Sequence, residues 1–242
     1  MDSMKAILLL TAAIAFATAP LLVPSFNGFD PQDFPYPPLD PPIQPAGYAF
    51  AIWGLLYLWL LAHSGFGLLR RAEDRGWDAP RWPLITSLTL GAIWLETATQ
   101  MPVTAVLLIW VMTGAAVMAL LRCPPGQDRW LLRAPIAAYA GWLTAAAGVG
   151  TGVALTGYGI GSPVAVALAM LALILALALA VQMRVPAPEY GAAVIWALVA
   201  VLVANVTSAP LVALAALVGG GIVAAAAWAA TARERIVTAG RS

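Results

Sequence analysis

The chain has 242 residues, of which 62% are hydrophobic and only 10% are charged, and its formal net charge is +1. A soluble domain carries about 25% charged residues, so this composition indicates an integral membrane protein with no room for a soluble domain. The near-neutral charge argues against a nucleic-acid partner. The single cysteine excludes an internal disulfide, and the single histidine argues against a His/Cys metal site.

Eight apolar segments come close to the roughly 20 residues that cross a bilayer. We assign them to residues 6–24, 46–69, 83–100, 103–121, 134–155, 163–183, 191–207 and 210–231. The predicted fold class is therefore an all-α, polytopic transmembrane bundle of about eight spans. A very short turn separates the last two segments, so a re-entrant pair is the alternative for them.

The first segment shares one feature with a cleaved signal peptide, because Ala17-Thr18-Ala19 has the small-x-small form of a cleavage site. Pro20 would then be the first mature residue, which disfavours cleavage, and the apolar run continues to Val23. We therefore predict a retained span.

All twelve Lys and Arg residues fall on one side of the membrane in this topology. They lie before the first span, after the last span, or in loops 70–82, 122–133 and 184–190. Lys and Arg concentrate in cytoplasmic loops. We therefore expect a protein of the bacterial inner membrane with both termini in the cytoplasm and loop 25–45 outside.

Loop 25–45 is rich in proline and includes the pair Pro41 and Pro42. Such a stretch cannot form a helix interior, and we expect it to be extended and stiff. Because it joins two neighbouring spans, we predict that it is a lid over the space between them. A plain connector is the alternative.

Aromatic residues concentrate in the first five spans. Phe50, Trp53 and Tyr57 are spaced i, i+3 and i+7, so they share one face of a helix. A cluster of rings inside a bundle suits a flat apolar ligand, because ring stacking adds to the burial of area. Ordinary aromatic packing is the alternative. The other rings predicted at membrane depth and in the same ligand site are Trp94, Tyr139 and Trp142.

Two ionisable residues within the spans are candidates for polar contacts to a ligand. Glu96 could accept a proton or pair with a cation, or it could reach the outer interface. His63 could be an axial ligand of a haem-like metal, or a hydrogen-bonded structural histidine. No constellation of catalytic residues accompanies them, so we expect neither enzyme activity nor a bound metal or obligatory cofactor.

Several of these segments resemble one known family. Gly47-Tyr48 and Phe50–Tyr57, after the paired prolines, resemble the start of the second helix in the TspO/MBR family. Its members are the tryptophan-rich sensory proteins, related to the mitochondrial translocator protein. Trp94 followed by Pro102 is similar to the third helix of that family, and 138–144 is similar to the fifth.

The resemblance implies two regions and a ligand. Residues 1–155 would form a TspO-like five-helix core, and 156–242 would add three transmembrane helices and a short cytoplasmic tail. The family pocket opens toward the first loop and binds porphyrins, haem-like tetrapyrroles, sterols or synthetic ligands. By resemblance its wall here contains Trp53 and Trp142, with Tyr57 and Tyr139 beside them. Porphyrin breakdown, proposed for the family, is left open.

This sequence also departs from the family pattern. Residues 39–44 contain no Trp, although the family has a Trp-rich segment there. Gly91 stands where the family often has Asn, and the Asn of the fifth helix is missing.

We predict an integral membrane receptor for a flat hydrophobic ligand, a tetrapyrrole by resemblance, that acts as a sensor, carrier or regulator. The first alternative is a structural or assembly subunit of a larger membrane complex, such as a pigment–protein complex. The later spans are mainly Ala, Leu and Val, with Gly219-Gly220-Gly221 in the last, and such small residues let helices approach closely. The second alternative is a small-solute transporter built on a four-plus-four repeat. The expected partners are the bilayer, the ligand, and either a second copy of the chain or a membrane-complex partner.

Overall fold

The structure, a computed structural model, describes residues 2–23 and 28–239, and it is helical without strands over that part. Seven stretches in these ranges are long and apolar enough to cross a membrane. These findings confirm the predicted polytopic helical bundle. The helices are α1 (Asp2–Leu22), α2 (Ile52–Arg70), α3 (Arg75–Asp78), α4 (Arg81–Gln100), α5 (Pro102–Arg122), α6 (Arg133–Gly157), α7 (Pro163–Arg184), α8 (Pro188–Asn205) and α9 (Pro210–Ala239), with 3-10 turns η1 (Pro31–Asp33) and η2 (Gly47–Ala51).

The eight long helices follow the eight predicted spans with small shifts at their ends. α4 has 20 residues, long enough to cross a bilayer, but it is the most polar of the eight and is not among the seven apolar stretches. α8 and α9 are each long and apolar enough to cross a membrane. The short α3, between α2 and α4, was not predicted.

Helix α6 is the centre of the bundle. It packs against α5 on one side and against α7 and α8 on the other, and α2 crosses it. Close approach to α8 requires Gly141, because a Cβ built there would overlap the carbonyl oxygen of Tyr190. The predicted boundary at residue 155 falls inside α6, two residues before its end.

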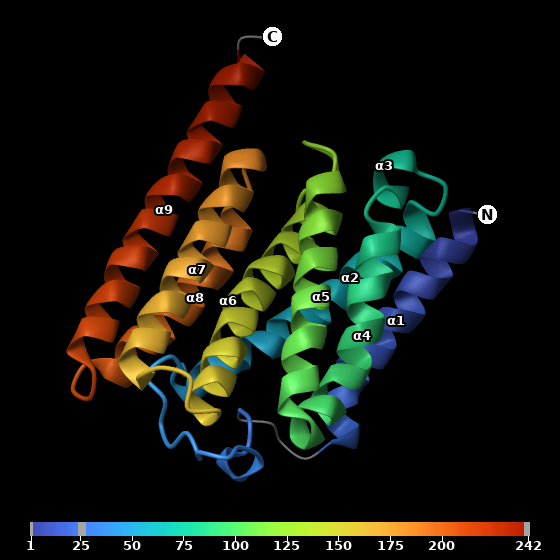
Figure 1. Ribbon diagram of the computed structural model, residues 1–242. Helices are drawn as coiled ribbons and strands as arrows, with labels where there is room; N and C mark the ends of the chain where they lie inside the picture. Colours follow the sequence, from blue (N-terminus) through green and yellow to red (C-terminus); the bar gives the residue numbers. More distant parts are fainter. Residues whose placement is uncertain (1, 24–27, 240–242) are drawn as a thin grey trace.

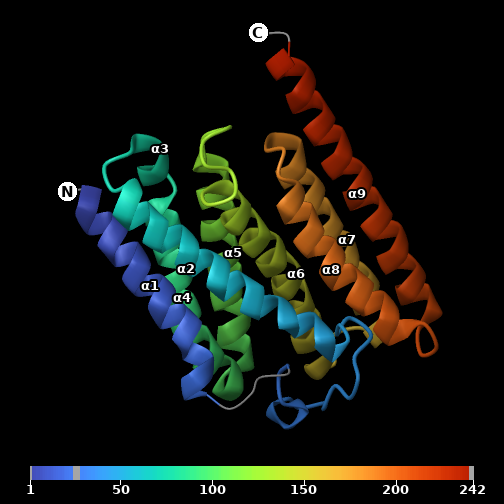
Figure 2. The same cartoon turned by 180° about the vertical axis from the view of Figure 1, so that it is seen from behind.

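Helix α2 lies obliquely across one face of the bundle (Figures 1 and 2). It begins with η2 beside α8, passes over α6 and ends beside α1. The N–H of Trp196 in α8 donates to the carbonyl of Ala49 in η2 at 2.9 Å. The start of α2 is therefore attached to the second half of the chain and its end to the first half.

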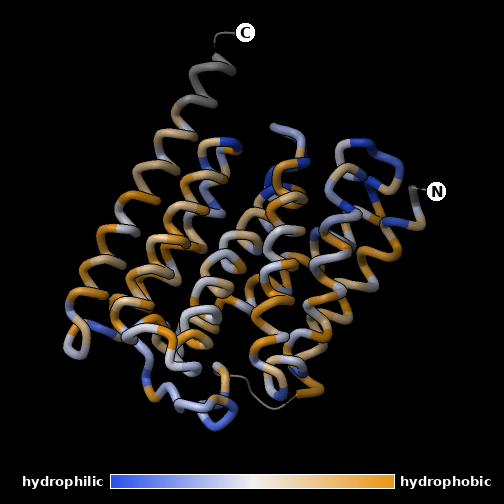
Figure 3. The backbone as a smooth tube through the Cα atoms, in the orientation of Figure 1, coloured by the Kyte–Doolittle hydropathy of each residue, from blue (hydrophilic) through white to orange (hydrophobic). Residues whose placement is uncertain are grey.

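The polar segments lie at the two ends of the bundle, and apolar residues lie between them (Figure 3). One end holds α3, the first residues of α1 and α6, and the last residues of α2, α5, α7 and α9. All loops expected to carry Lys and Arg are at that end, which we call the basic end (Figure 1). The proline-rich loop is at the other end.

Candidate functional site

Aromatic rings from η2, α1, α2 and α6 meet inside the bundle. The rings of Trp53 and Tyr57 stack with centroids 5.5 Å apart and an angle of 16°. Trp142 of α6 meets Trp53 edge-on at 5.9 Å and Phe50 at 6.3 Å. Edge-to-face and offset-stacked pairs at these separations are favourable. The structure therefore brings together Phe50, Trp53, Tyr57 and Trp142.

Phe16 of α1 is the residue of this cluster that sequence reasoning missed. Its ring is buried and lies edge-on to Trp53, Tyr57 and Tyr139, with centroids 5.7, 5.1 and 5.6 Å away. Through Phe16, Tyr139 joins the other predicted rings. Nothing in the local sequence marks Phe16, because α1 is apolar on all sides.

Hydrogen bonds fix two of the predicted rings. The hydroxyl of Ser87 donates to the carbonyl of Met112 at 2.9 Å, so the phenol of Tyr139 donates to Ser87 at 3.0 Å. The N–H of Trp94 donates to the carbonyl of Ala105 at 2.8 Å. The buried N–H of Trp142, in contrast, has no hydrogen-bond partner within the described part of the chain. Buried N–H groups without partners are rare.

Two adjoining, almost wholly apolar cavities border these rings, and together we call them the aromatic cleft. The cavity toward α1 holds about 790 Å³ of empty space, and the cavity toward the loop holds about 560 Å³, part of it open to the outside in both cases. Phe50 and Trp94 line both cavities. The α1 cavity is also lined by Phe16, Trp53 and Tyr57, and the loop cavity by Phe29, Gln44, Pro45 and Trp142.

The proline-rich loop is bound to the second half of the chain. The N–H of Tyr36 donates to the carbonyl of Gly157 at 3.0 Å, and that of Ala46 donates to the carbonyl of Ala200 at 3.1 Å. The buried side-chain amide of Asn205 donates to the carbonyl of Pro42 at 2.8 Å.

Pro41 and Pro42 do not themselves line the aromatic cleft. The loop lines the aromatic cleft through Gly28, Phe29, Gln44 and Pro45.

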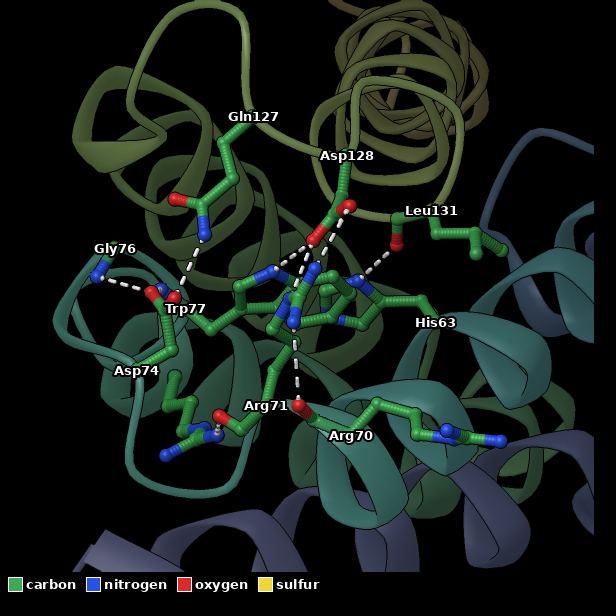
Figure 4. Close-up of polar contacts among 10 residues, drawn as sticks. His63, Arg70, Arg71, Asp74, Gly76, Trp77, Gln127, Asp128 and Leu131 are labelled. Carbon is green, nitrogen blue, oxygen red and sulfur yellow. Dashed lines mark hydrogen bonds and ion pairs between the residues drawn. The ribbon is translucent and has the colours of Figure 1, made fainter.

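His63 lies away from the aromatic cleft, in a polar cluster at the basic end (Figure 4). Its Nδ1 is 2.7 Å from the carbonyl oxygen of Leu131, and its ring stacks on Trp77 with centroids 5.1 Å apart. Nδ1 therefore carries the proton when the ring is neutral. The buried Nε2 has no hydrogen-bond partner among the described residues. His63 thus holds the 123–132 loop against α2, and it does not reach the predicted ligand rings.

Asp128 is the main acceptor of this polar cluster. It accepts from Nε of Arg71 at 2.8 Å and from the indole of Trp77 at 2.9 Å (Figure 4). The hydrogen bond from Arg71 is the main cause of a lowered pKa of Asp128. Asp74 accepts from the amide of Gln127 at 2.7 Å, which lowers the pKa of Asp74. These bonds tie the loop around α3 to the loop between α5 and α6.

Glu96 is exposed near the end of α4 and accepts a hydrogen bond from Gln100. It lines a separate hollow with Ala19, Leu22 and Thr97, outside the aromatic cleft. Over the described residues, no group of three or more His, Cys, Asp or Glu side chains is placed to hold a metal ion. The geometry of the cleft therefore suits binding of an apolar molecule through shape and ring contacts.

A comparison with protein-family models agrees with this architecture. The model of the TSPO-like protein family matches residues 6–229, from α1 into α9. The match thus extends beyond residues 1–155, the part of the chain in which the sequence motifs resemble the TspO/MBR family. Among curated proteins and among solved structures, the searches found no match. The family match covers most of the sequence, and the chain therefore belongs to the TSPO-like protein family.

Proposed function

We propose that the aromatic cleft binds a flat hydrophobic ligand, in the first place a tetrapyrrole, and that the protein acts as a sensor, carrier or regulator. The observation that carries the proposal is the ring cluster around Trp53 and Trp142, with apolar cavities of about 790 and 560 Å³ beside it. Ligand pockets are mostly apolar spaces of about 300–1,000 Å³ with a few polar groups. Trp142 lines the cavity on the loop side, and its buried N–H has no hydrogen-bond partner among the described residues.

The loop that carries Pro41 and Pro42 is proposed as the cover of this site. Phe29, Gln44 and Pro45 lie at the cavity on the loop side, so ligand entry at this end requires their displacement. The concentration of Lys and Arg at the opposite end supports an orientation with both termini in the cytoplasm. In this orientation the cover faces the outside of an inner membrane.

The test is a titration of the purified full-length protein with protoporphyrin, followed by tryptophan quenching and by the Soret band. We expect Trp53→Ala with Trp142→Ala to weaken binding by at least about fivefold, because each ring contributes about 0.5–1.5 kcal/mol beyond its area. The matched control is Trp82→Ala with Trp228→Ala, which also removes two indoles but from exposed positions. Equal affinities of the two double variants would contradict the proposed site.

One observation favours the second candidate, a subunit of a larger membrane complex. In α9, Cβ atoms built at Gly220 and Gly221 would meet nothing within 4 Å. Helices approach closely where such small residues face each other. Under this alternative, Gly220→Leu with Gly221→Leu would release a partner that copurifies in mild detergent, and porphyrin affinity would stay unchanged.

A further inference from the structure

A second apolar space lies on the outer face of the bundle, between α2 and α8. The two helices touch at η2 and diverge toward the basic end (Figure 2). The resulting groove holds about 880 Å³ of empty space, part of it open to the outside, and has Ala138 of α6 in its lining. We call it the α2–α8 groove, and its walls include Leu55, Trp59, Ala192 and Trp196. It shares no lining residue with the aromatic cleft.

An ion pair and two indoles close the groove toward the basic end. Glu189 lines the groove and accepts from Nη2 of Arg129 at 2.5 Å. The guanidinium of Arg129 lies 4.9 Å from the ring centre of Trp130, which stacks with Trp59. The N–H of Trp59 donates to the carbonyl of Trp130 at 2.8 Å. Trp and Arg are typical of the headgroup level of a bilayer, so the apolar groove ends at that level.

Arg129 retains capacity to bind an anion. Its side chain is 45% exposed, and its Nε and Nη1 have no hydrogen-bond partner in the part of the chain that the structure describes. A guanidinium has five N–H donors in a planar fork that matches phosphate. The α2–α8 groove, with such a donor at one end, matches a molecule that has a phosphate at one end and a hydrocarbon chain at the other.

We infer that the α2–α8 groove binds a phospholipid of the surrounding bilayer, with one acyl chain along the groove and the phosphate at Arg129. The groove opens on the outer face of the bundle, where the hydrocarbon of the bilayer lies, and apart from Glu189 its lining is apolar and aromatic. This lining suits a hydrocarbon chain of the surrounding lipid. The inference does not depend on the ligand of the aromatic cleft.

The test uses the full-length protein in nanodiscs that contain a phospholipid with a diazirine in its acyl chain. After photolysis, mass spectrometry of peptides locates the label. Native mass spectrometry from mild detergent counts the phospholipids that stay bound. We expect the label to be enriched on α2 and α8 relative to the lipid-facing side of α9, and at least one phospholipid to be retained.

Two variants with matched controls probe the two ends of the site. Ala192→Phe fills the groove from an exposed position, and Ala224→Phe adds the same ring to an exposed position of α9. Arg129→Gln removes the phosphate contact, and Arg122→Gln removes an exposed cation outside the groove. We expect Ala192→Phe to lower labelling several-fold and Arg129→Gln to lower lipid retention by about tenfold, the value of a charge-assisted hydrogen bond. The controls should not change either readout.

Two results would overturn the inference. One is even labelling of α2, α8 and α9 that neither Ala192→Phe nor Arg129→Gln changes. The other is a dimer in native mass spectra that Ala192→Phe dissociates, because a second copy of the chain would then occupy the groove. Arg129 is exposed, so Arg129→Gln tests the site even if Ala192→Phe impairs folding.

Discussion

The ring of Phe16 in α1 occupies the space that a side chain at Gly91 of α4 would need. A Cβ built at Gly91 would lie 2.6 Å from two ring carbons of Phe16. Because residue 91 is glycine, the ring of α1 can contact the rings of α2 and α6. An apolar ring from another helix therefore fills the space beside position 91.

Gly91→Ala should destabilise the protein by about 1–3 kcal/mol, the usual cost of an added methyl group in a packed core. Unfolding in mixed micelles with increasing SDS would measure this change. The matched control is Gly114→Ala in α5, where a Cβ would meet nothing within 4 Å. This control should be neutral or slightly stabilising, because Ala favours a helix over Gly. A loss in Gly91→Ala that Phe16→Leu does not relieve would argue against the proposed contact.

Ser87→Ala and Tyr139→Phe should differ in cost although they break the same hydrogen bond. Ser87→Ala leaves the fully buried phenol of Tyr139 without its acceptor, which costs about 1–3 kcal/mol. Tyr139→Phe leaves Ser87 still bonded to Met112, so we expect about 0.5–1.5 kcal/mol. The same unfolding assay compares the two variants. A larger loss in Tyr139→Phe would mean that the hydroxyls do not donate in the order described.

Asn205→Ala should loosen the loop over the cleft without unfolding the bundle. It removes the amide that binds the carbonyl of Pro42. Loss of one such bond is worth about 0.5–1.5 kcal/mol, so the amides of Gln44 and Ala46 should exchange hydrogen about two- to tenfold faster. Mass spectrometry of peptides from the loop measures this exchange. Ser208→Ala, an exposed change in the turn after α8, is the control and should leave the exchange unchanged.

Asp128→Asn should lower the thermal midpoint at neutral pH but not in acid. Arg71 lowers the pKa of Asp128 in the folded protein, so the carboxylate stabilises the fold above the unfolded pKa of about 3.9. This stabilisation is lost as the pH falls through the lower folded pKa. We expect a deficit of at most about 4 °C at pH 7 that begins to shrink below about pH 4 and disappears only below the lowered folded pKa. Asp33→Asn, in the exposed loop, controls for the loss of one charge. A deficit that does not shrink at all as the pH falls below about 4 would contradict the ion pair.

The spans and the ring face of α2 could be predicted from sequence because their signals are local. Runs of apolar residues mark the spans, and the spacing of Phe50, Trp53 and Tyr57 marks one helix face. The role of Phe16 could not be predicted, because a helix that is apolar all round does not reveal which side meets protein. The site of His63 could not be predicted either, because its partner is the backbone carbonyl of Leu131 in a distant loop.

The oblique path of α2 could not be predicted from the sequence either. The positions of the spans in the sequence give the length of each helix and the side of the membrane on which consecutive helices are joined. The angle at which two helices cross depends on how their side chains pack. The hydrogen bond from Trp196 to the carbonyl of Ala49 fixes the start of α2 against α8. No sequence pattern in η2 or in α8 indicates this hydrogen bond. The α2–α8 groove follows from this path and was therefore not predicted either.

Three hydrogen bonds join the proline-rich loop to α6 and α8: Tyr36 and Ala46 donate, and the carbonyl of Pro42 accepts. They link the position of the loop thermodynamically to that of α8. A molecule that displaces the loop on entering the cleft must strain or break contacts made by α8. Linkage is reciprocal, so a lipid that binds at α8 would change the affinity of the cleft for a ligand by the same factor as that ligand changes the affinity for the lipid. Lipid composition next to α8 would then tune ligand affinity, even though lipid and ligand never touch.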